Sequence, residues 1–585
     1  MKRSHYATEL GLEHVGKSVV LKGWVNTRRD HGGLIFVDLR DRSGIIQIVF
    51  NPELNEPAFH LAEIIRSEYV IEITGEVKQR SAETVNPNLL TGKIEVHVAE
   101  MNVLNEAKTP PFYIEDDLNV DEMLRMKYRY LDLRRPEMQK NLYLRHKVLK
   151  LIRDYLDARG FWEIETPMLG RSTPEGARDY LVPSRLHAGE FYALPQSPQQ
   201  YKQMLMVAGV EKYFQIARCF RDEDLRADRQ PEFTQLDMEM SFTEEEDIYS
   251  LVEEMIALIF KEGIGVEVKT PFPRIDYQEA MLKYGSDKPE LRFGMEIVDI
   301  SSIVANAGFK VFKQAISSGG VVRALNARGC GSFPRREIDQ LGELAVASGA
   351  KGMAWINVTD KELKSPITKF LTQEEIDQIL AAVQAKPGDL LLFAADNEAV
   401  ASKVLGILRL EIGKRLRLMD PDHLVFTWVQ GFPLLEYDDE EKRYVAVHHP
   451  FTAPVEEDVA AMEADPAHIR SRAYDLVLNG VELGGGSIRI HQRSLQEKMF
   501  ALLGITGEEA QDKFGFMLNA FEYGTPPHGG IAFGIDRLIM LMARRESIRD
   551  VIAFPKTQSA MCIMTEAPST VSNKQLRELS LKIRE

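Results

Sequence analysis

The chain has 585 residues, 44% of them hydrophobic and 27% charged, which is the composition of a folded protein with several domains. Its formal net charge of −16 excludes a general binder of polyanions, so any contact with nucleic acid is expected at a local basic patch. Three widely spaced cysteines exclude a disulfide framework and a cysteine zinc site, and the lack of a long apolar run or an apolar leader predicts a cytoplasmic protein without membrane spans.

The first hundred residues are predicted to form a small β-barrel. Segments rich in Val and Ile, separated by Gly, Asp or Asn turns, predict strands at residues 19–26, 34–39, 45–50, 69–77 and 94–103. A helix at about 57–66 falls between the third and fourth strands, and this order is that of an OB-fold, which often binds oligonucleotides. Residues 11–18 match the P-loop pattern, but a strand-like segment follows them, which argues against a phosphate loop.

The remaining chain is predicted to form two further domains, one inserted into the other. A Pro-rich linker begins at Thr109, a long helix covers about 140–159, and a strand at 161–166 stops at Pro167. Helices at 335–347 and 372–385 and strands at 353–357 and 390–394 form a separate α/β unit. We therefore predict a barrel at 1–107, a linker at 108–138, a second domain at 139–287 and 419–556, an inserted α+β domain at 288–418 and a C-terminal extension at 557–585.

Polar side chains gather on one face of a predicted strand at 231–242. The residues on this face are Phe233, Gln235, Asp237, Glu239 and Ser241, which alternate with apolar residues. An aromatic ring, an amide and two carboxylates on one face are costly to build without a ligand, so the pattern predicts a binding site. Arg221 and Glu223, two residues apart just upstream, are expected to face together.

Three motifs resemble those of the class II aminoacyl-tRNA synthetases. Arg221 and Glu223 resemble the FRxE signature of the second motif, and the glycine-rich turn at 529–534, leading into an apolar helix with Arg537 at its start, resembles the third. A cation at a helix N-terminus opposes the helix dipole unless a bound anion such as a polyphosphate reverses the penalty. Residues 156–167 resemble the first motif, which in this family builds the interface of a homodimer.

The whole chain resembles the aspartyl-tRNA synthetases of the bacterial type, which have an OB-fold, an antiparallel-sheet catalytic domain and a large insert between the second and third motifs. The stretches that carry the resemblance are residues 172–176, 196–202, 220–223, 229–237, 448–452, 482–489 and 534–537. The resemblance implies a ligase that converts L-aspartate and ATP to aspartyl-adenylate and then transfers the aspartyl group to the 3′ end of tRNA(Asp).

The resemblance implies an aspartate site around two cations. Lys202 and Arg489 would bind the side-chain carboxylate, Arg489 with both ends of its fork, and Asp237 would orient both. Ser197 is predicted to cap the helix that carries Lys202, with Pro198 at its first position. Of the adjacent His448 and His449, one would close over the amino acid, and we favour His448. The full implied set is Glu175, Ser197, Gln199, Lys202, Arg221, Gln235, Asp237, His448, His449 and Arg489, with Glu175 and Gln235 on the α-ammonium.

The resemblance also implies an ATP site. Arg221 would bind the α-phosphate, Glu223 the adenine amino group, and Arg537 either the adenine or the γ-phosphate; these three form the implied catalytic set. The implied ATP-binding residues are Arg221, Asp222, Glu223, Gln230, Phe233, Glu482, Gly534, Ile535, Asp536 and Arg537. Asp475 and Glu482 suit a Mg²⁺ ion that accompanies ATP. Glu482 and Arg489 would point oppositely on a flat strand, and the glycines at 484–486 offer a bulge that corrects this.

In this family the OB-fold reads the anticodon. Phe36 would stack on the central uridine, and Arg28, Gln47 and Glu95 would hydrogen-bond to anticodon bases. Members that charge both tRNA(Asp) and tRNA(Asn) tend to carry His where this chain has His31, whereas members restricted to tRNA(Asp) carry Leu. At Glu83, a second position of this kind, the relaxed pattern often has a small residue, so Glu83 departs from it.

These residues favour an enzyme that charges both tRNA(Asp) and tRNA(Asn) and needs an amidotransferase downstream. Three alternatives stay open: an enzyme restricted to tRNA(Asp), a paralogue that uses asparagine or lysine or makes a free amide, and a catalytically inactive tRNA-binding protein. Lys202 and Arg489 argue against the second, because two cations suit an acidic substrate. The intact motif residues argue against the third. The residues of the insert suggest no chemistry.

Overall fold

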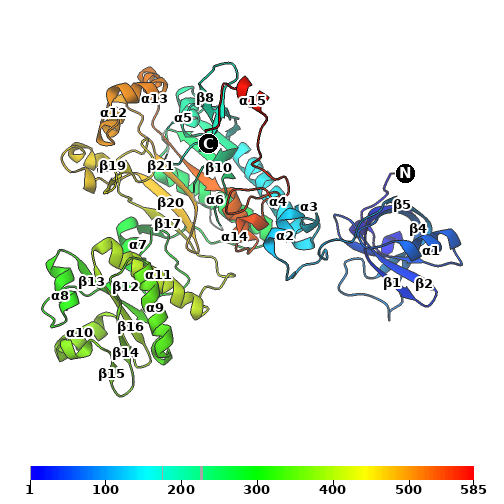
Figure 1. Ribbon diagram of the computed structural model, residues 1–585, viewed down its shortest axis with the longest axis horizontal. Helices are drawn as coiled ribbons and strands as arrows, with labels where there is room; N and C mark the ends of the chain where they lie inside the picture. Colours follow the sequence, from blue (N-terminus) through cyan, green and yellow to red (C-terminus); the bar gives the residue numbers. More distant parts are fainter. Residues whose placement is uncertain (1, 174–175, 224–227, 585) are drawn as a thin grey trace. The chain divides into compact units, whose positions relative to one another are not determined.

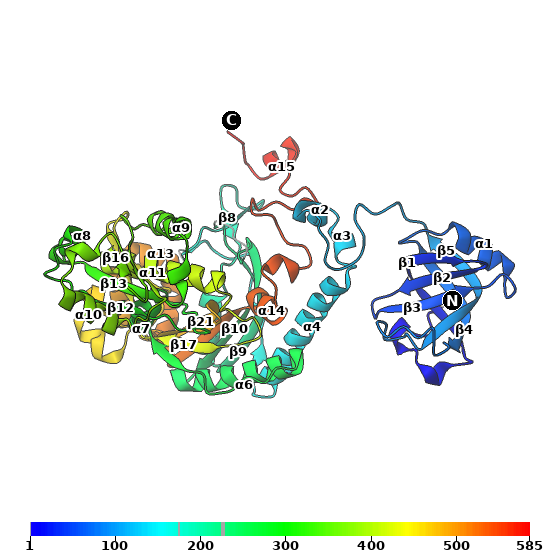
Figure 2. The same cartoon turned by 90° about the horizontal axis from the view of Figure 1, so that it is seen from below.

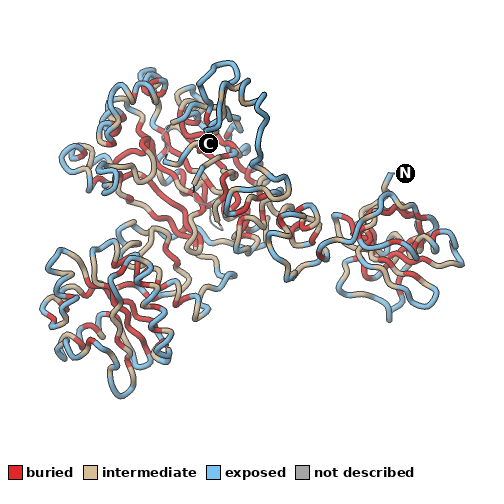
Figure 3. The backbone as a smooth tube through the Cα atoms, in the orientation of Figure 1, coloured by how far each residue is buried: buried red, intermediate tan, exposed pale blue. Residues whose placement is uncertain are grey.

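The computed structural model describes residues 2–173, 176–223 and 228–584. The chain divides into two compact units, one of Met1–Arg145 with Arg549–Ser569 and the other of His146–Ile548 with Thr570–Glu585. Buried residues follow the strands and the helix faces that pack on them (Figure 3). Among the described residues, no helix is both long enough and apolar enough to cross a membrane.

The first unit contains the predicted barrel (Figure 2). Its elements are β1 (Ser18–His31), β2 (Leu34–Arg40), β3 (Ile45–Phe50), α1 (Glu56–Ile64), β4 (Val70–Gln79) and β5 (Ile94–Asn105). The strands close in the order β1-β2-β3-β5-β4, which confirms the predicted OB-fold. The strand β1 is longer than predicted because its first half pairs with β4 and its second half with β2. It follows directly on the P-loop-like residues, which confirms that they form no phosphate loop.

The predicted linker contains short helices and is held to the barrel by buried charges. It includes α2 (Glu122–Lys127), α3 (Arg129–Asp132) and the start of α4 (Pro136–Asp157). The Glu68 carboxylate accepts two bonds from Arg40 at 2.7 Å and one from Arg134 at 2.6 Å. The Arg134 guanidinium also lies 5.1 Å from the Trp24 ring centroid. Because Glu68 is buried, these bonds fix the chain that leaves the barrel.

The second unit is built on an eight-stranded sheet in the order β11-β17-β20-β21-β22-β10-β9-β6 (Figure 1). Its strands are β6 (Trp162–Glu163), β9 (Lys212–Phe220), β10 (Glu232–Ser241), β11 (Arg274–Asp276), β17 (Phe426–Gln430), β20 (Ala473–Leu478), β21 (Val481–Ile488) and β22 (His528–Gly534). The central strands pair antiparallel, as predicted. The strand predicted at 161–166 is reduced to the two residues of β6, which pair parallel with β9.

Helices cover the sheet and the connections around it. Helix α6 (Glu245–Ile264) buries a full apolar face, and its Tyr249 packs on Trp428 of β17 with ring centroids 4.4 Å apart. The other elements of this unit outside the insert are α5 (Gln199–Val207), α7 (Tyr277–Tyr284), α12 (Arg493–Leu502), α13 (Gly507–Ala520), α14 (Ile535–Met542), α15 (Asn573–Glu578), and the small hairpins β7 (Leu181–Pro183) with β8 (Phe191–Ala193) and β18 (Leu435–Asp438) with β19 (Arg443–Ala446).

The insert is a five-stranded antiparallel sheet flanked by helices. Its elements are β12 (Ile297–Asp299), α8 (Lys310–Ser317), β13 (Val321–Ala327), α9 (Arg335–Ala347), β14 (Ala354–Val358), β15 (Leu363–Lys364), α10 (Gln373–Ala382), β16 (Leu390–Asp396) and α11 (Glu398–Arg415). Both predicted helices and both predicted strands are present, and α9 has the predicted bounds. Each face of this sheet has its own apolar core, which makes the insert a folded body.

Candidate functional site

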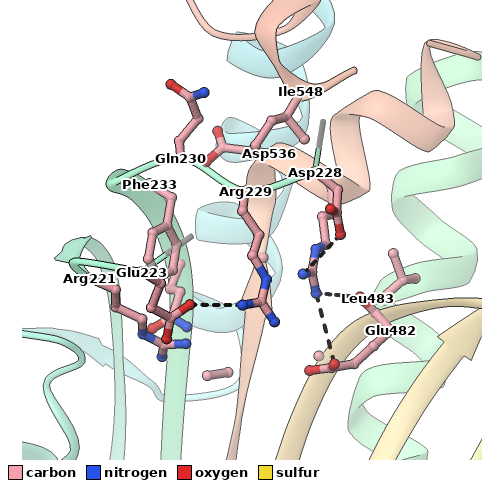
Figure 4. Close-up of a pocket in the computed structure, with 15 residues that line it drawn as sticks. Arg221, Glu223, Asp228, Arg229, Gln230, Phe233, Glu482, Leu483, Asp536 and Ile548 are labelled. Carbon is pink, nitrogen blue, oxygen red and sulfur yellow. Dashed lines mark hydrogen bonds and ion pairs between the residues drawn. The ribbon is translucent and has the colours of Figure 1, made fainter. Parts of the chain in front are cut away.

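A cavity of about 180 Å³ opens where the hairpin of β9 and β10 meets β21, β22 and α14 (Figure 4). Its lining residues are Arg221, Glu223, Asp228, Arg229, Gln230, Phe233, Gln235, Glu482, Leu483, Gly484, Ala532, Gly534, Asp536, Arg537 and Ile548. The lining therefore unites the predicted second and third motifs with Glu482, which lies between them in sequence. Such a concave site with convergent polar groups is the expected form of a ligand pocket.

Arg221 and Glu223 reach this cavity together, as predicted from their spacing. The Arg221 guanidinium lies 5.1 Å from the centre of the Phe233 ring, on the partner strand. The Glu223 carboxylate accepts a bond from Arg229 at 2.9 Å, which Figure 4 shows as a dashed contact. Arg229 thus neutralises the carboxylate that is predicted to meet adenine.

Arg537 stands in the first turn of α14, as the third motif predicts. Its guanidinium donates to Asp228 at 3.2 Å and to the Glu482 carbonyl at 3.3 Å. Its neighbours serve the helix instead, because Ile535 is fully buried and the Asp536 carboxylate accepts the Thr234 N–H at 3.0 Å. Two residues of the implied ATP set therefore hold the helix against β10, although Asp536 also lines the cavity.

The glycines before α14 lie within strand β22, so the predicted turn at 529–534 is wrong. Gly530 pairs with Glu239 in the ladder of β10 and β22. A Cβ atom on Gly530 would come within 2.0 Å of the Met238 carbonyl oxygen and 2.2 Å of Glu239 Oε2, which is too close for any side chain. Glycine is required at this position because the β10 backbone and the buried Glu239 carboxylate both approach it closely.

Behind the cavity, four charged side chains form a buried cluster. Lys202 Nζ on α5 lies 3.2 Å from Asp237 and 3.4 Å from Glu239. Arg489, which directly follows β21, donates to both oxygens of Glu239 at 2.9 and 3.2 Å. All four residues are at most 2% exposed. Asp237 orients Lys202 as predicted, but the carboxylate that holds Arg489 is Glu239.

The two carboxylates of this cluster differ in how well they are satisfied. Burial acts to raise the pKa of Glu239, but Arg489 and Lys202 outweigh it and hold that pKa below its ordinary value. For Asp237 burial prevails and raises the pKa. Its Oδ2 atom is buried without a hydrogen-bond partner among the described residues. A hydrogen-bond donor of a substrate could therefore bind to Oδ2 of Asp237.

His449, and not the favoured His448, lies against Arg489. Nε2 of His449 accepts from Arg489 Nη1 at 2.6 Å, because arginine can only donate. Its Nδ1 atom lies 3.2 Å from the Phe451 nitrogen and 3.4 Å from the Thr452 hydroxyl. His449 therefore helps to fix the Arg489 guanidinium. His448 Nε2 is 3.4 Å from Asp475 Oδ1.

Helix α5 presents Gln199, Lys202 and Gln203 on one buried face, as predicted. The N-cap position belongs to Pro198 instead of Ser197, although the Ser197 hydroxyl still accepts the Gln199 N–H at 3.4 Å. Gln199 donates to Gln203 at 3.3 Å, and Gln203 lies 3.1 Å from Nε2 of the buried His528. This amide and imidazole chain packs beside the charge cluster and was not predicted.

The predicted metal carboxylates converge above Gly485. A Cβ atom on Gly485 would lie 2.6 Å from Asp475 Oδ1 and 3.8 Å from Glu482 Oε1. The ladder of β20 and β21 shifts register at Leu483, so the predicted bulge exists one residue before the glycines. Burial raises the pKa of Asp475, and the charge of Glu482 adds to the effect. A buried carboxylate, Asp475, beside a half-buried one, Glu482, fits a divalent cation that shares its coordination with phosphates.

The predicted anticodon residues share one outer face of the barrel, with one change. Gln47 donates to Glu95 at 3.0 Å, and the Phe36 ring lies 5.7 Å from the His31 ring. Arg28 pairs with the buried Val37 in the ladder and donates to the Ala62 carbonyl at 2.7 Å, so it belongs to a different face. Its neighbour Arg29 is the arginine opposite Phe36. The alternation of a strand explains this revision, because one residue changes the face.

Two predicted residues lie apart from these sets. Glu83 is exposed in the connection between β4 and β5. Glu175 lies outside the described residues. His31 ends β1 and pairs with Leu34 across a two-residue turn, Gly32-Gly33, in which both φ angles are positive, 56° and 107°. This turn needs glycine and fixes His31 at an exposed hairpin end.

Comparisons with known proteins agree with this geometry. The family model of class II tRNA synthetases (D, K and N) matches residues 121–558, and that of the OB-fold nucleic acid binding domain matches 19–104. The chain is 69% identical to the aspartate--tRNA(Asp/Asn) ligase of Syntrophomonas wolfei and 59% identical to the aspartate--tRNA ligase of Geobacillus kaustophilus; the alignments cover all of this chain and 100% and 99% of those proteins. The crystal structure of asparaginyl-tRNA synthetase from Pyrococcus horikoshii with asparaginyl-adenylate superimposes with a TM-score of 0.61 at 19% identity, over 95% of this chain and 98% of that one, which shows a shared fold.

The buried His449 makes stability depend on pH. Burial, with Arg489 nearby, lowers its pKa well below 6.5, so below about pH 6.5 the unfolded chain binds a proton that the native chain refuses. The contribution of His449 to the free energy of unfolding is fully present above this pH. It decreases as the pH falls, by up to about 1.4 kcal/mol per pH unit. We expect urea titrations between pH 7.5 and 5.5 to show a shallower decline for His449→Gln than for the wild type. His468→Gln, at an exposed position, should keep the wild-type slope. Equal slopes for all three proteins would contradict the assignment.

Proposed function

The chain belongs to the class II tRNA synthetases (D, K and N), and on that basis we propose that it joins L-aspartate to tRNA(Asp) and tRNA(Asn) at the expense of ATP. Full-length relatives named aspartate--tRNA(Asp/Asn) ligase, such as the one at 69% identity, support this function. Its substrates are then L-aspartate, ATP and tRNA, and we assign the protein to the cytoplasm, where these substrates occur together.

The observation that carries the proposal is the pair of buried cations, Lys202 and Arg489. An aspartate carboxylate offers acceptors and charge to both of them. Asparagine would direct part of its side chain, an N–H₂ donor, at groups that can only donate. A lysine side chain would bring an ammonium against two buried cations. The site is thus built against the two other amino acids of this family group.

The first chemical step is assigned to the cavity of the second and third motifs. An oxygen of the aspartate α-carboxylate bonds to the α-phosphorus of ATP, and the bond from that phosphorus to the bridging oxygen breaks, so pyrophosphate leaves. Arg221 offers charge to the α-phosphate as this occurs, and its stacking on Phe233 keeps it in place. The 3′-terminal hydroxyl of tRNA then attacks the adenylate carbonyl, and AMP leaves. Positioning and charge account for both steps, without a covalent nucleophile from the protein.

A Mg²⁺ ion is assigned to Asp475 and Glu482, because their oxygens converge above Gly485. When bound, the ion would neutralise phosphate charge. His448 Nε2 donates to Asp475 Oδ1 at 3.4 Å and so orients this carboxylate. Arg537 lies 3.9 Å from Glu482, so the arginine and the metal carboxylate would serve the same phosphates from two sides.

The proposal extends to partners. The sheet edge at β6 is unpaired among the described residues, and Trp162 and Leu169 beside it are 63% and 52% exposed. The exposed Trp162 within the first motif, with Leu169 just after it, supports a homodimer through residues 156–167. Charging of tRNA(Asn) with aspartate would require an amidotransferase as a downstream partner. The convergence of Arg221, Glu223 and Arg537 on one cavity supports an active enzyme over an inactive tRNA-binding paralogue.

The aspartate site is tested by Arg489→Lys. Lysine keeps the positive charge but lacks the guanidinium group, with which Arg489 binds Glu239 and would also bind the side-chain carboxylate of aspartate. The KM for aspartate should therefore rise about tenfold to a hundredfold, while the KM for ATP changes little. Aspartate-dependent ATP–pyrophosphate exchange measures both constants. Arg493→Lys, on an exposed helix surface, is the matched control. An unchanged KM for aspartate in Arg489→Lys would contradict the assignment.

The tRNA specificity is tested by His31→Leu. The imidazole lies at an exposed hairpin end beside Phe36, where it can contact an anticodon base, and leucine removes its hydrogen bonds. We expect wild-type protein to charge purified tRNA(Asp) and tRNA(Asn) at comparable rates. His31→Leu should charge tRNA(Asn) about tenfold more slowly or worse and leave tRNA(Asp) nearly unchanged. His60→Leu, exposed on α1, controls for loss of a surface histidine. Equal losses on both tRNAs would refute a role in discrimination.

A further inference from the structure

Lys288 reaches the proposed metal carboxylate from the segment that leads into the insert. Its Nζ atom lies 3.0 Å from Glu482 Oε2, an oxygen that is also 3.9 Å from Arg537 Nη1. The Lys288 side chain is 36% exposed, so its ammonium is at the edge of the cavity and can change partners. Lys288 is absent from both sets of predicted binding residues, because no motif covers it.

Two cations face two carboxylates beside the cavity. Lys288 and Arg537 both face Glu482, with Asp475 beside it. A divalent cation on Glu482 and Asp475 would supply the positive charge that Lys288 now gives and would repel the ammonium. The polyphosphate that arrives with this cation is the anion within reach.

We propose that Lys288 binds the β- and γ-phosphates of ATP, which become the leaving pyrophosphate, and that it exchanges Glu482 for phosphate when the metal–nucleotide complex binds. The inference rests on the proposed function and adds a phosphate ligand to the same site. Lysine is suited to this exchange because it acts as a point charge on a flexible stem, without the fixed fork of arginine.

The insert determines where Lys288 stands. Arg409 of α11 is 1% exposed, and its guanidinium donates to the carbonyls of Glu290, Phe293, Gly294 and Met295 at 2.7 to 3.1 Å. These carbonyls follow Lys288 within seven residues.

The segment is also held before Lys288. The Ser286 hydroxyl accepts the Lys288 N–H at 3.0 Å. Gly285 closes α7 with a φ of +67°, and a Cβ there would come within 2.1 Å of the Ser402 carbonyl on α11. Helix α11 thus contacts the segment on both sides of Lys288 and fixes its position. The insert therefore contributes to the site by placing this lysine.

The proposal is tested with Lys288→Ala, Lys288→Arg and the control Lys283→Ala. Lys283 has the same exposure, 37%, and pairs with Glu279 on its own helix. Aspartate-dependent ATP–pyrophosphate exchange at saturating Mg²⁺ gives the KM for pyrophosphate, ATP and aspartate separately. We expect Lys288→Ala to raise the KM for pyrophosphate about tenfold or more, because a charge-assisted contact is lost. The KM for aspartate should stay within about twofold, Lys288→Arg should recover part of the loss, and Lys283→Ala should match wild type.

Two results would overturn the proposal. An unchanged KM for pyrophosphate in Lys288→Ala would show that the lysine does not touch phosphate. An equal rise in the KM for aspartate would show that Lys288 only holds the Glu482 side chain in position and does not bind phosphate. Calorimetric binding of Mg·ATP without amino acid tests Lys288 separately from the proposed function. A weaker Mg·ATP affinity in Lys288→Ala, by about tenfold, supports the inference even if the wild type activates a different amino acid.

Discussion

The site depends on buried ion pairs between two carboxylates of strand β10 and two cations. Asp237 and Glu239 stand on one face of this strand, and Lys202 and Arg489 come to them from α5 and from the end of β21. A buried cluster of four charges is stable only when every member is paired, because loss of one partner leaves an uncompensated charge worth about 3–5 kcal/mol. Gly530, beside this cluster, must lack a side chain because a Cβ atom would meet both the Met238 carbonyl and the Glu239 carboxylate.

The nucleotide half of the site follows a different rule, because its charges are paired in ways that a ligand can replace. Glu223 is held by Arg229, Arg537 by Asp228, and Glu482 by Lys288, and each of these pairs has a partner that is more than one fifth exposed. Exposed pairs contribute about 0–1 kcal/mol, so a ligand can exchange them at small cost. In the proposed assignment, the buried pairs select the amino acid, whereas the exposed pairs give way to the phosphates of ATP. This division agrees with a reaction in which one substrate must be recognised and the other held by its phosphates.

Much of this arrangement could be predicted from the sequence where local pattern and motif agree. The alternation at 231–242 gave the face of β10, and the spacing of Arg221 and Glu223 gave their common direction. Local pattern could not assign partners: Glu239 was on the predicted face, but only the tertiary fold pairs it with Arg489. Adjacent residues are the hardest to separate, as with His448 and His449 or Arg28 and Arg29, because strand register and loop path decide between them. Lys288 carried no signal, since it lies in a connection without periodicity.

The central claim is that the buried cations Lys202 and Arg489 select an acidic amino acid. The most direct measurement is ATP–pyrophosphate exchange by the full-length protein with aspartate, asparagine and lysine in parallel, without tRNA. The account predicts exchange with aspartate that exceeds exchange with the other two by at least about a hundredfold, because a mismatched donor or cation at a buried site costs several kcal/mol. Exchange that is as fast with asparagine or lysine as with aspartate would contradict it.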